Sequence, residues 1–256
     1  MIRLFIIALT TLLLALSPAT AERLVVSLSN QRVPVTSNFI GENLVLFGTI
    51  EADAGRSLRS SYDLVVTVSG PPESLRTRRK KRVLGIWVNV DTREFLNVPS
   101  YLAVLSNRPI TAIATPEVLR RQQVGLLNTI LTQRVGADFA DTVPNDPFRA
   151  AFVRLKEQQQ LYSESAEGVT FLTPTVFRAT IPIPSNARTG DYSVDTKLFA
   201  GGQLLTRAHS GLRVIKTGAE QYIAEAANEQ PVLYGLATMS MALAIGWFAS
   251  VVFRRD

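Results

Sequence analysis

The sequence contains no cysteine and a single histidine, His209. The absence of thiols excludes disulfides, thiolate catalysis, cysteine-ligated zinc and covalent haem attachment. One imidazole excludes metal sites built from several histidines, and it leaves one candidate for a Ser-His-Asp arrangement. In the segment "QLLTRAHSGLRVIK", His209 shares strand parity with Arg207 and Arg213, whereas apolar residues occupy the opposite parity. We therefore expect His209 on the solvated face of a strand.

Common catalytic motifs are also missing. We find no G-x-S-x-G, H-E-x-x-H, P-loop or G-x-G-x-x-G pattern. Asp191 and Asp195 share one strand face, but paired surface carboxylates are common and need no catalytic role. The sequence therefore favours a protein that is not an enzyme and that uses no cofactor and no metal. An envelope-polymer hydrolase that works with carboxylates alone is the less favoured alternative.

Charge is absent from an apolar run near the N-terminus. The run extends from Leu4 to Leu16, follows Arg3, and is succeeded by the A-x-A pattern of residues 19–21. It is shorter than the ~20 residues that a membrane-spanning helix needs. We predict a signal peptide over residues 1–21, with an uncleaved anchor as the alternative.

A second segment without charge lies near the C-terminus, from Val232 to Phe253. At ~1.5 Å per residue it spans about 33 Å, enough to cross the hydrocarbon core. Arg254 and Arg255 follow, and the positive-inside rule places such residues in the cytoplasm. We predict a transmembrane helix over residues 231–253, a cytoplasmic tail over 254–256, and a domain exported to the other side.

Small side chains recur at four-residue spacing within this helix. Such residues allow two membrane helices to approach closely, although they are also frequent in membrane helices in general. The helix-packing candidates are Ser240, Ala242, Ala244, Gly246 and Ser250.

The segment between the two apolar runs is mainly β in pattern. Short alternating runs are separated by Gly and Pro turns, and "FAGGQLL" is typical of a tight hairpin. Thr115-Pro116 and Asp146-Pro147 are helix start signals. We predict an immunoglobulin-like β-sandwich over residues 22–216 with a helical insertion at about 115–163, and a stem over 217–230. Two small domains are the alternative. The predicted strands are Arg23–Leu28, Asn43–Ala52, Tyr62–Ser69, Arg82–Asp91, Glu94–Val98, Tyr101–Ser106, Val169–Leu172, Val176–Ile183, Tyr192–Ala200 and Gln203–Ile215.

"NARTGDYSV" is similar to the corner before a late strand of immunoglobulin-like domains. There a tyrosine hydroxyl bonds back to the backbone a few residues upstream. Tyr192 is the corresponding tyrosine in this chain.

The formal net charge is +6, and the basic residues concentrate in "RTRRKKR". Export removes nucleic acid as a target, so two interpretations remain open. The charges protect an exposed strand edge from pairing, or they contact an anionic surface or partner. By simple alternation the even-numbered members share a face with Leu84, Ile86, Val88 and Val90, as expected for a strand that projects into solvent. The candidate binding residues are Arg76, Arg78, Arg79, Lys80, Lys81 and Arg82.

Several segments taken together resemble the alphaproteobacterial transmembrane protein family Alph_Pro_TM. They include "RVPVTSNFIGENLVLFGTI", "RRKKRVLGIWVNV", "FLNVPSYLAVLSNRPI" and the ending "LYGLATMSMALAIGWFASVVFRRD". The resemblance implies a single-pass inner-membrane protein of a Gram-negative cell, with its domain in the periplasm. It also suggests a multi-pass exporter as a membrane partner. It implies no catalytic residues.

The sequence therefore predicts a membrane-anchored periplasmic module that acts as an accessory or interaction subunit for an inner-membrane protein such as a transporter. A periplasmic ligand- or envelope-binding domain that uses residues 76–82 is the alternative.

Overall fold

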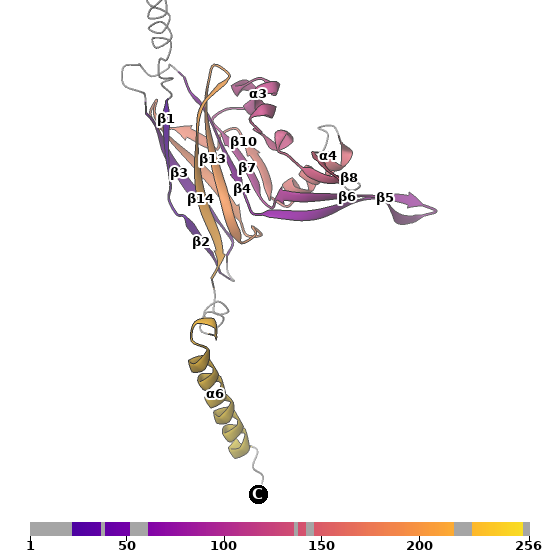
Figure 1. Ribbon diagram of the computed structural model, residues 1–256, viewed down its shortest axis with the longest axis vertical. Coiled ribbons are helices and arrows are strands. Elements are labelled where there is room, and N and C mark those ends of the chain that lie inside the picture. Colours follow the sequence, from indigo (N-terminus) through magenta and orange to yellow (C-terminus); the bar gives the residue numbers. More distant parts are fainter. Residues whose placement is uncertain are drawn as a thin grey trace, which may run out of the picture.

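The computed structural model describes residues 22–36, 39–51, 61–135, 138–141, 146–217 and 227–252. The predicted signal peptide, the cytoplasmic tail and most of the stem lie outside these residues. Within them the protein is mainly β, with one long apolar helix near the C-terminus (Figure 1). The mainly β class predicted from the sequence is therefore confirmed.

Two sheets pack face to face over a shared core. Sheet A has the strand order β1-β3-β12-β11, and sheet B has the order β10-β7-β4-β13-β14-β2. The strands of sheet A are β1 (Arg23–Leu28), β3 (Gly41–Glu51), β12 (Val176–Pro184) and β11 (Val169–Phe171). Those of sheet B are β10 (Tyr162–Ser165), β7 (Leu102–Ser106), β4 (Asp63–Ser69), β13 (Gly190–Ala200), β14 (Gln203–Lys216) and β2 (Arg32–Val35). The immunoglobulin-like arrangement of these strands stays a prediction.

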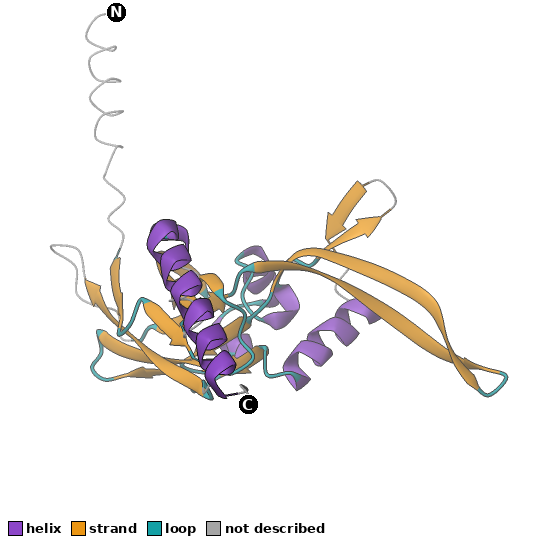
Figure 2. Ribbon diagram, turned by 90° about the horizontal axis from the view of Figure 1, so that it is seen from below, coloured by secondary structure: helices purple, strands orange, loops and turns teal. Residues whose placement is uncertain are grey.

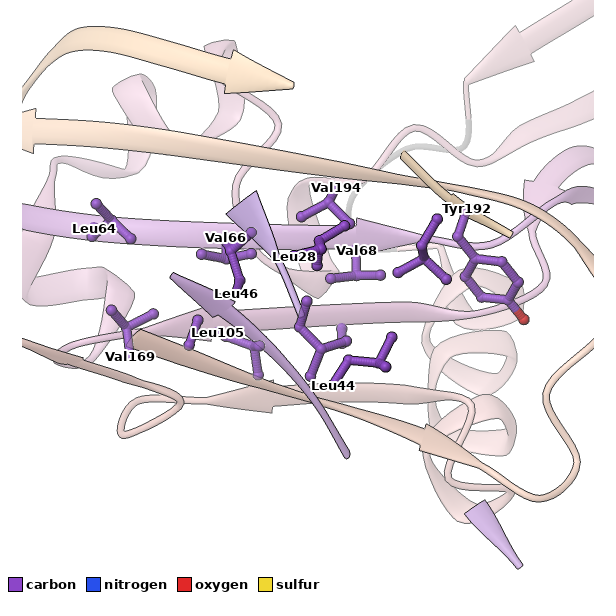
Figure 3. Close-up of a cluster of buried hydrophobic side chains, with 14 of the residues drawn as sticks. Leu28, Leu44, Leu46, Leu64, Val66, Val68, Leu105, Val169, Tyr192 and Val194 are labelled. Carbon is purple, nitrogen blue, oxygen red and sulfur yellow. The ribbon is translucent and has the colours of Figure 1, made fainter. Parts of the chain in front are cut away.

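The core between the two sheets follows from period-two alternation. In β12, Phe177 and Ile181 are buried whereas Arg178 and Thr180 are exposed, because successive side chains of a strand point to opposite faces. Leucine and valine side chains from β3 and β4 meet in this layer (Figure 3). The predicted hairpin at Gly201-Gly202 is also present, and both glycines adopt positive φ, at 56° and 78°.

Around β4 and β7, sheet B is covered on its other face as well, by helices. In β4 and β7 consecutive residues are buried without alternation, which indicates packing on both faces. Side chains of sheet B such as Val65, Val104 and Phe199 form a second core with residues of the helical segments. These segments are α2 (Ile110–Ile113), α3 (Pro116–Arg121), the 3-10 turn η1 (Leu126–Asn128) and α4 (Pro147–Gln158).

Both predicted helix starts are confirmed. The Thr115 side chain accepts a hydrogen bond from the Val118 amide, and Asp146 accepts one from the Phe148 amide at 2.7 Å. Both helices are shorter than their apolar patterns indicate. α3 ends at Arg121 because Gln123 adopts φ 53° and the Val124 amide bonds back to the Leu119 carbonyl.

α4 ends in the same way, at Gln158, before the end of the predicted helical insertion at about 163. Gln160 has φ 59°, and the Leu161 amide bonds to the Lys156 carbonyl. Tyr162 itself begins β10, which pairs in parallel with β7. Sequence patterns missed this strand because it is short and carries little apolar alternation.

A third sheet extends away from the body of the protein. Sheet C has the order β5-β6-β8-β9, and it consists of β5 (Pro72–Val83), β6 (Ile86–Pro99), β8 (Thr132–Val135) and β9 (Asp138–Asp141). Its strands β5 and β6 form a long hairpin that projects far beyond the two packed sheets (Figures 1 and 2). The predicted strands Arg82–Asp91 and Glu94–Val98 were placed wrongly, because a turn at Leu84-Gly85 separates the basic strand from one continuous β6.

Tyr192 makes the backbone hydrogen bond that its sequence context predicts. Its hydroxyl donates to the Arg188 carbonyl at 2.6 Å. Burial, and secondly the negative charge of Glu73, raises the pKa of Tyr192 to about 12. Tyr101 and Tyr162 are buried too, and burial raises the pKa of each. All three phenols are therefore held in the neutral form more strongly in the folded state than in the unfolded state.

We expect the protein to lose stability in alkali. An unfolded tyrosine ionises near pH 10, whereas folded Tyr192 ionises only near pH 12. The stabilisation is therefore complete below pH 10 and is lost as pH rises through 12. Urea unfolding across this window measures the effect. A Tyr192→Phe variant, about 1 kcal/mol less stable at neutral pH, should show a shallower decline. Equal declines in both proteins would contradict this account.

Candidate functional site: the projecting β5–β6 hairpin

The root of the hairpin is fixed by a buried ion-pair cluster. Glu73 of β5 pairs with Lys156 of α4 and, at 2.9 Å, with Arg188 from the loop before β13. The side chains of Glu73 and Lys156 are 12% and 7% exposed, whereas that of Arg188 is 60% exposed. The Lys156 ammonium also lies 5.9 Å from the ring centroids of Phe152 and Tyr162. One carboxylate therefore joins the hairpin, the helix layer and the loop that enters β13 of sheet B.

Aromatic packing fixes the next part of the hairpin. Leu75 and Phe95 are a cross-strand pair, and Phe95 is fully buried in the second core with its ring centroid 4.8 Å from that of Phe152. Further out, the guanidinium groups of Arg79 and Arg93 lie over the Phe148 ring at 6.0 and 5.4 Å. The proximal half of the hairpin is thus packed along α4 (Figure 2).

Between the hairpin and α4 lies a shallow groove of about 250 Å³ with a cationic rim. Arg78, Lys80 and Arg154 line it, and Phe148 and Leu155 supply its apolar wall. The Leu155 side chain is 45% exposed at this position. The groove can therefore accept an anionic group that carries apolar substituents.

The distal half of the hairpin is exposed on both faces. Leu84 and Gly85 form its two-residue turn, and both have positive φ, 47° and 86°. Every residue from 78 to 90 is exposed. Six apolar side chains in this segment are between 40% and 100% exposed, namely Val83, Leu84, Ile86, Trp87, Val88 and Val90.

The register of the hairpin corrects the predicted distribution of charge. Arg82 pairs with Trp87, and Lys81 pairs with Val88. Because directly paired residues share a face, Arg82 lies beside Trp87 and not on the face of Ile86 and Val88. The two-residue turn reverses the parity that an unbroken strand would have, and a register shift at Arg79/Lys80 changes it again. Cationic and apolar side chains are therefore mixed on both faces of the tip.

The predicted binding residues lie together along β5. Arg76 pairs with Glu94 at 3.5 Å, and the Arg82 guanidinium donates to the Gly85 carbonyl at 3.2 Å. The other members of the run, and Arg82, make no ion pair with any residue that the structure describes. Their charge is therefore available to an external anionic group. The sequence analysis identified this basic run but missed the exposed apolar tip. The dipeptide Leu84-Gly85 between two β-rich segments was the signal that could have indicated a turn there.

The second predicted set lies on α6 (Pro231–Val252), the one helix among the described residues that is long and apolar enough to cross a membrane. Its small residues Ser240, Ala242, Ala244, Gly246 and Ser250 are all exposed. The Ser240 hydroxyl donates to the Leu236 carbonyl within the helix at 2.8 Å. Helix packing through these residues stays a prediction.

His209 lies on the outer face of sheet B, and its side chain is 62% exposed, so its predicted placement on a solvated face is confirmed. Its Nδ1 is 3.2 Å from Asp195, which also pairs at 2.7 Å with the nearly buried Lys197. The two carboxylates singled out in the sequence are separately engaged, since Asp191 pairs with Arg213. In the described part of the chain, no three His, Asp or Glu side chains gather closely enough to hold a metal ion.

The outer parts of the protein, an exposed apolar helix and a cationic hairpin, are those expected of a protein that works at a membrane. A search among curated proteins found no match. A protein-family model with the description "Putative transmembrane protein (Alph_Pro_TM)" matches residues 23–255, nearly the whole chain and both of these elements. The chain therefore belongs to the Alph_Pro_TM family of transmembrane proteins.

Proposed function

We propose that the protein is a non-enzymatic accessory module of the inner membrane. In this proposal α6 anchors a periplasmic β domain, the C-terminus is cytoplasmic, and the partner is a neighbouring inner-membrane protein such as a multi-pass transporter. Membership of a transmembrane protein family supports the membrane setting, and so does α6, the one membrane-length apolar helix among the described residues.

The observation that carries the proposal is the distribution of large exposed apolar side chains. The two sheets and the helix layer bury most of their large apolar side chains in two cores. Outside those cores, the exposed ones concentrate on α6 and at the tip of the β5–β6 hairpin. Contiguous exposed apolar surface marks interaction sites. α6 lies in the membrane in this proposal, so the surface that meets a partner helix must be on α6 itself.

One side of α6 suits close contact with another helix. Ala242, Gly246 and Ser250 recur every four residues and therefore lie on one side of the helix. Small residues in such a row let two backbones approach, and van der Waals packing then stabilises the pair. Ser240 and Ala244 form a second row on another side.

A paired substitution on α6 tests the proposal. We expect the full chain, tagged and purified from membranes in a mild detergent, to bring a membrane protein with it. The double variant Ala242→Leu/Gly246→Leu should reduce that recovery by about tenfold, because bulky side chains separate the helices. Recovery is measured by quantitative mass spectrometry of the purified material.

Met241→Phe is the matched control, since it adds bulk on a side of α6 away from the Ala242–Gly246 row. It should leave recovery unchanged. Purification of the intact protein alone under gentle conditions would refute the proposal. If Met241→Phe reduced recovery of the partner equally, bulk anywhere on α6 would disturb the complex. The row of Ala242, Gly246 and Ser250 would then have no specific role.

A further inference from the structure

We propose that the tip of the β5–β6 hairpin, residues 80–90, inserts into the interfacial region of the anionic phospholipid bilayer that holds α6. The hairpin would then be a second membrane contact that sets the orientation of the β domain. This inference goes beyond the proposed accessory function and does not depend on a protein partner.

The composition of the tip matches a membrane interface. Leu84 is 100% exposed, Trp87 68% and Ile86 66%, so the apex offers apolar surface to its surroundings. Tryptophan favours the region of the lipid head groups, where its ring is half in contact with hydrocarbon. Next to the apex, β5 carries three cationic side chains, Lys80, Lys81 and Arg82. In an inserted hairpin they would lie at the depth of the anionic head groups. Long cationic side chains can extend to the head groups while their stems contact acyl chains.

Leu84 is an unfavourable choice for the turn on local grounds. With φ at 47° it occupies the left-handed region, in which Asn, Asp and Gly are preferred at this type of two-residue turn. It is also fully exposed, so it stabilises no core. A strained, exposed leucine at the apex of a projecting hairpin is explained by contact with an apolar environment outside the protein.

The mixture of side chains on both faces favours lipid over a protein groove. Arg82 and Trp87 share one face, whereas Lys81 and Val88 share the other. A protein groove would contact one face of a ribbon and leave the opposite face in water. A bilayer surrounds an inserted tip on all sides, and it can take apolar and cationic groups on both faces.

The root of the hairpin is close to the place where the chain leaves for the membrane. Pro71, just before β5, lies close to Gly190. A Cβ added to Gly190 would be 3.0 Å from the proline ring. Gly190 pairs with Val214, near the end of β14 at Lys216, from which the chain continues to α6. The hairpin therefore departs from the end of sheet B that is connected to the membrane helix.

Length and attachment allow the hairpin to reach the bilayer and hold the domain. At ~3.3 Å per residue β5 spans about 40 Å. In Figure 1 it runs across the direction of α6, so contact requires the domain to lean toward its hairpin side. Residues 217–230 connect β14 of the β domain to α6. Because α6 already holds the domain at the surface, weak lipid contacts gain a high effective concentration.

Tryptophan fluorescence of the full chain tests the insertion. The sequence has two tryptophans, Trp87 and Trp247, so Trp247→Phe leaves Trp87 as the only reporter. The protein is placed in lipid nanodiscs that contain no other membrane protein. The lipid is phosphatidylcholine alone, or equal parts of phosphatidylcholine and phosphatidylglycerol, each with and without brominated acyl chains. We expect brominated lipid to quench Trp87 in the anionic nanodiscs and its emission to shift to shorter wavelength.

Two variants separate charge from apolar contact. Lys80→Gln/Lys81→Gln/Arg82→Gln should weaken the contact by about fivefold per charge, or about a hundredfold in total. Arg120→Gln/Arg121→Gln/Arg207→Gln removes the same charge from exposed positions elsewhere and should have no effect. Leu84→Asn suits the turn and should keep or raise thermal stability, yet weaken the contact by about tenfold.

Each outcome decides the proposal. Trp87 that is unaffected by brominated lipid and fully open to aqueous acrylamide in anionic nanodiscs would overturn it. Equal quenching of Trp87 in neutral nanodiscs would show that the insertion does not require anionic lipid, and would overturn that part of the proposal. A photo-crosslinker at position 84 that captures a protein in native membranes, with no lipid quenching, would assign the tip to a protein partner instead.

Discussion

Replacing Glu73 with glutamine should lower the free energy of unfolding by about 3–5 kcal/mol, the usual cost of breaking a buried ion pair. Glu73 and Lys156 are 12% and 7% exposed, so loss of the carboxylate leaves a lysine charge largely enclosed by protein. The nearest remaining acceptors are the Ser100 carbonyl at 3.4 Å and the faces of two aromatic rings. Neither replaces a carboxylate. The measurement is urea unfolding of the full chain in mild detergent, followed by circular dichroism.

Two further variants isolate the cause. Arg188→Gln removes the other partner of Glu73, but that side chain is 60% exposed and its loss should cost less than about 1 kcal/mol. In Glu73→Gln/Lys156→Met no charge is left buried, so this double variant should be more stable than Glu73→Gln alone. If Glu73→Gln were no more harmful than Arg188→Gln, the buried pair would not hold the hairpin root.

The same cluster connects stability with the proposed membrane contact. Glu73 is the second residue of β5, at the root of the hairpin, and Lys156 is on the helix along which β5 runs. A loosened root would let the hairpin change direction relative to the domain. In the Trp87 experiment, Glu73→Gln should therefore keep contact with anionic lipid while the domain loses its fixed orientation.

Truncation of Phe95 should have an effect of similar size. We expect Phe95→Ala to cost about 3–5 kcal/mol, the range found when a buried phenylalanine is replaced by alanine. Its ring is fully buried and packs against the Phe152 ring with 4.8 Å between their centroids, and the Phe152 ring centroid in turn lies 5.9 Å from that of Tyr162. The cavity would open between β6 and α4, where the surrounding aromatic rings limit collapse. Urea unfolding of the two proteins measures the difference.

Phe47→Ala is the matched control, because this phenylalanine of β3 is 46% exposed. Its removal should cost less than about 1 kcal/mol, since nearly half of this residue's surface already contacts solvent. A further expectation concerns the hairpin, because Phe95 holds β6 against the helix layer. Proteolytic cleavage after the arginines and lysines of residues 76–82 should be faster in Phe95→Ala than in Phe47→Ala. Similar costs for both variants would contradict the central position of Phe95 in the second core.

The sequence by itself determined the elements whose signals are local. Period-two alternation placed β1, β12, β13 and β14 close to their observed bounds, because one or both faces of these strands are buried. Thr115 and Asp146 marked helix starts because their side chains satisfy free backbone amides at the first turn. The apolar composition of residues 232–252 was sufficient to identify a helix able to cross a membrane.

The tertiary structure decided what depends on partners distant in the chain. β5 carries a dense basic run without an apolar period, and it is a strand because β6 pairs along its length. The helices α3 and α4 end early where residues with positive φ redirect the chain, so that Leu126 and Tyr162 reach the second core. Lys156 and Glu73 are far apart in sequence, and only folding makes them a pair.

The candidate site shows the same division. The sequence identified the basic residues 76–82 because charge is visible in composition alone. It did not show that Val83, Leu84, Ile86 and Trp87 stand exposed at a turn, since an apolar run is equally typical of a buried strand. Whether such a run enters a core or the surroundings depends on what packs against it. In this protein α4 covers only the proximal half of the hairpin, and that packing leaves the apolar tip exposed.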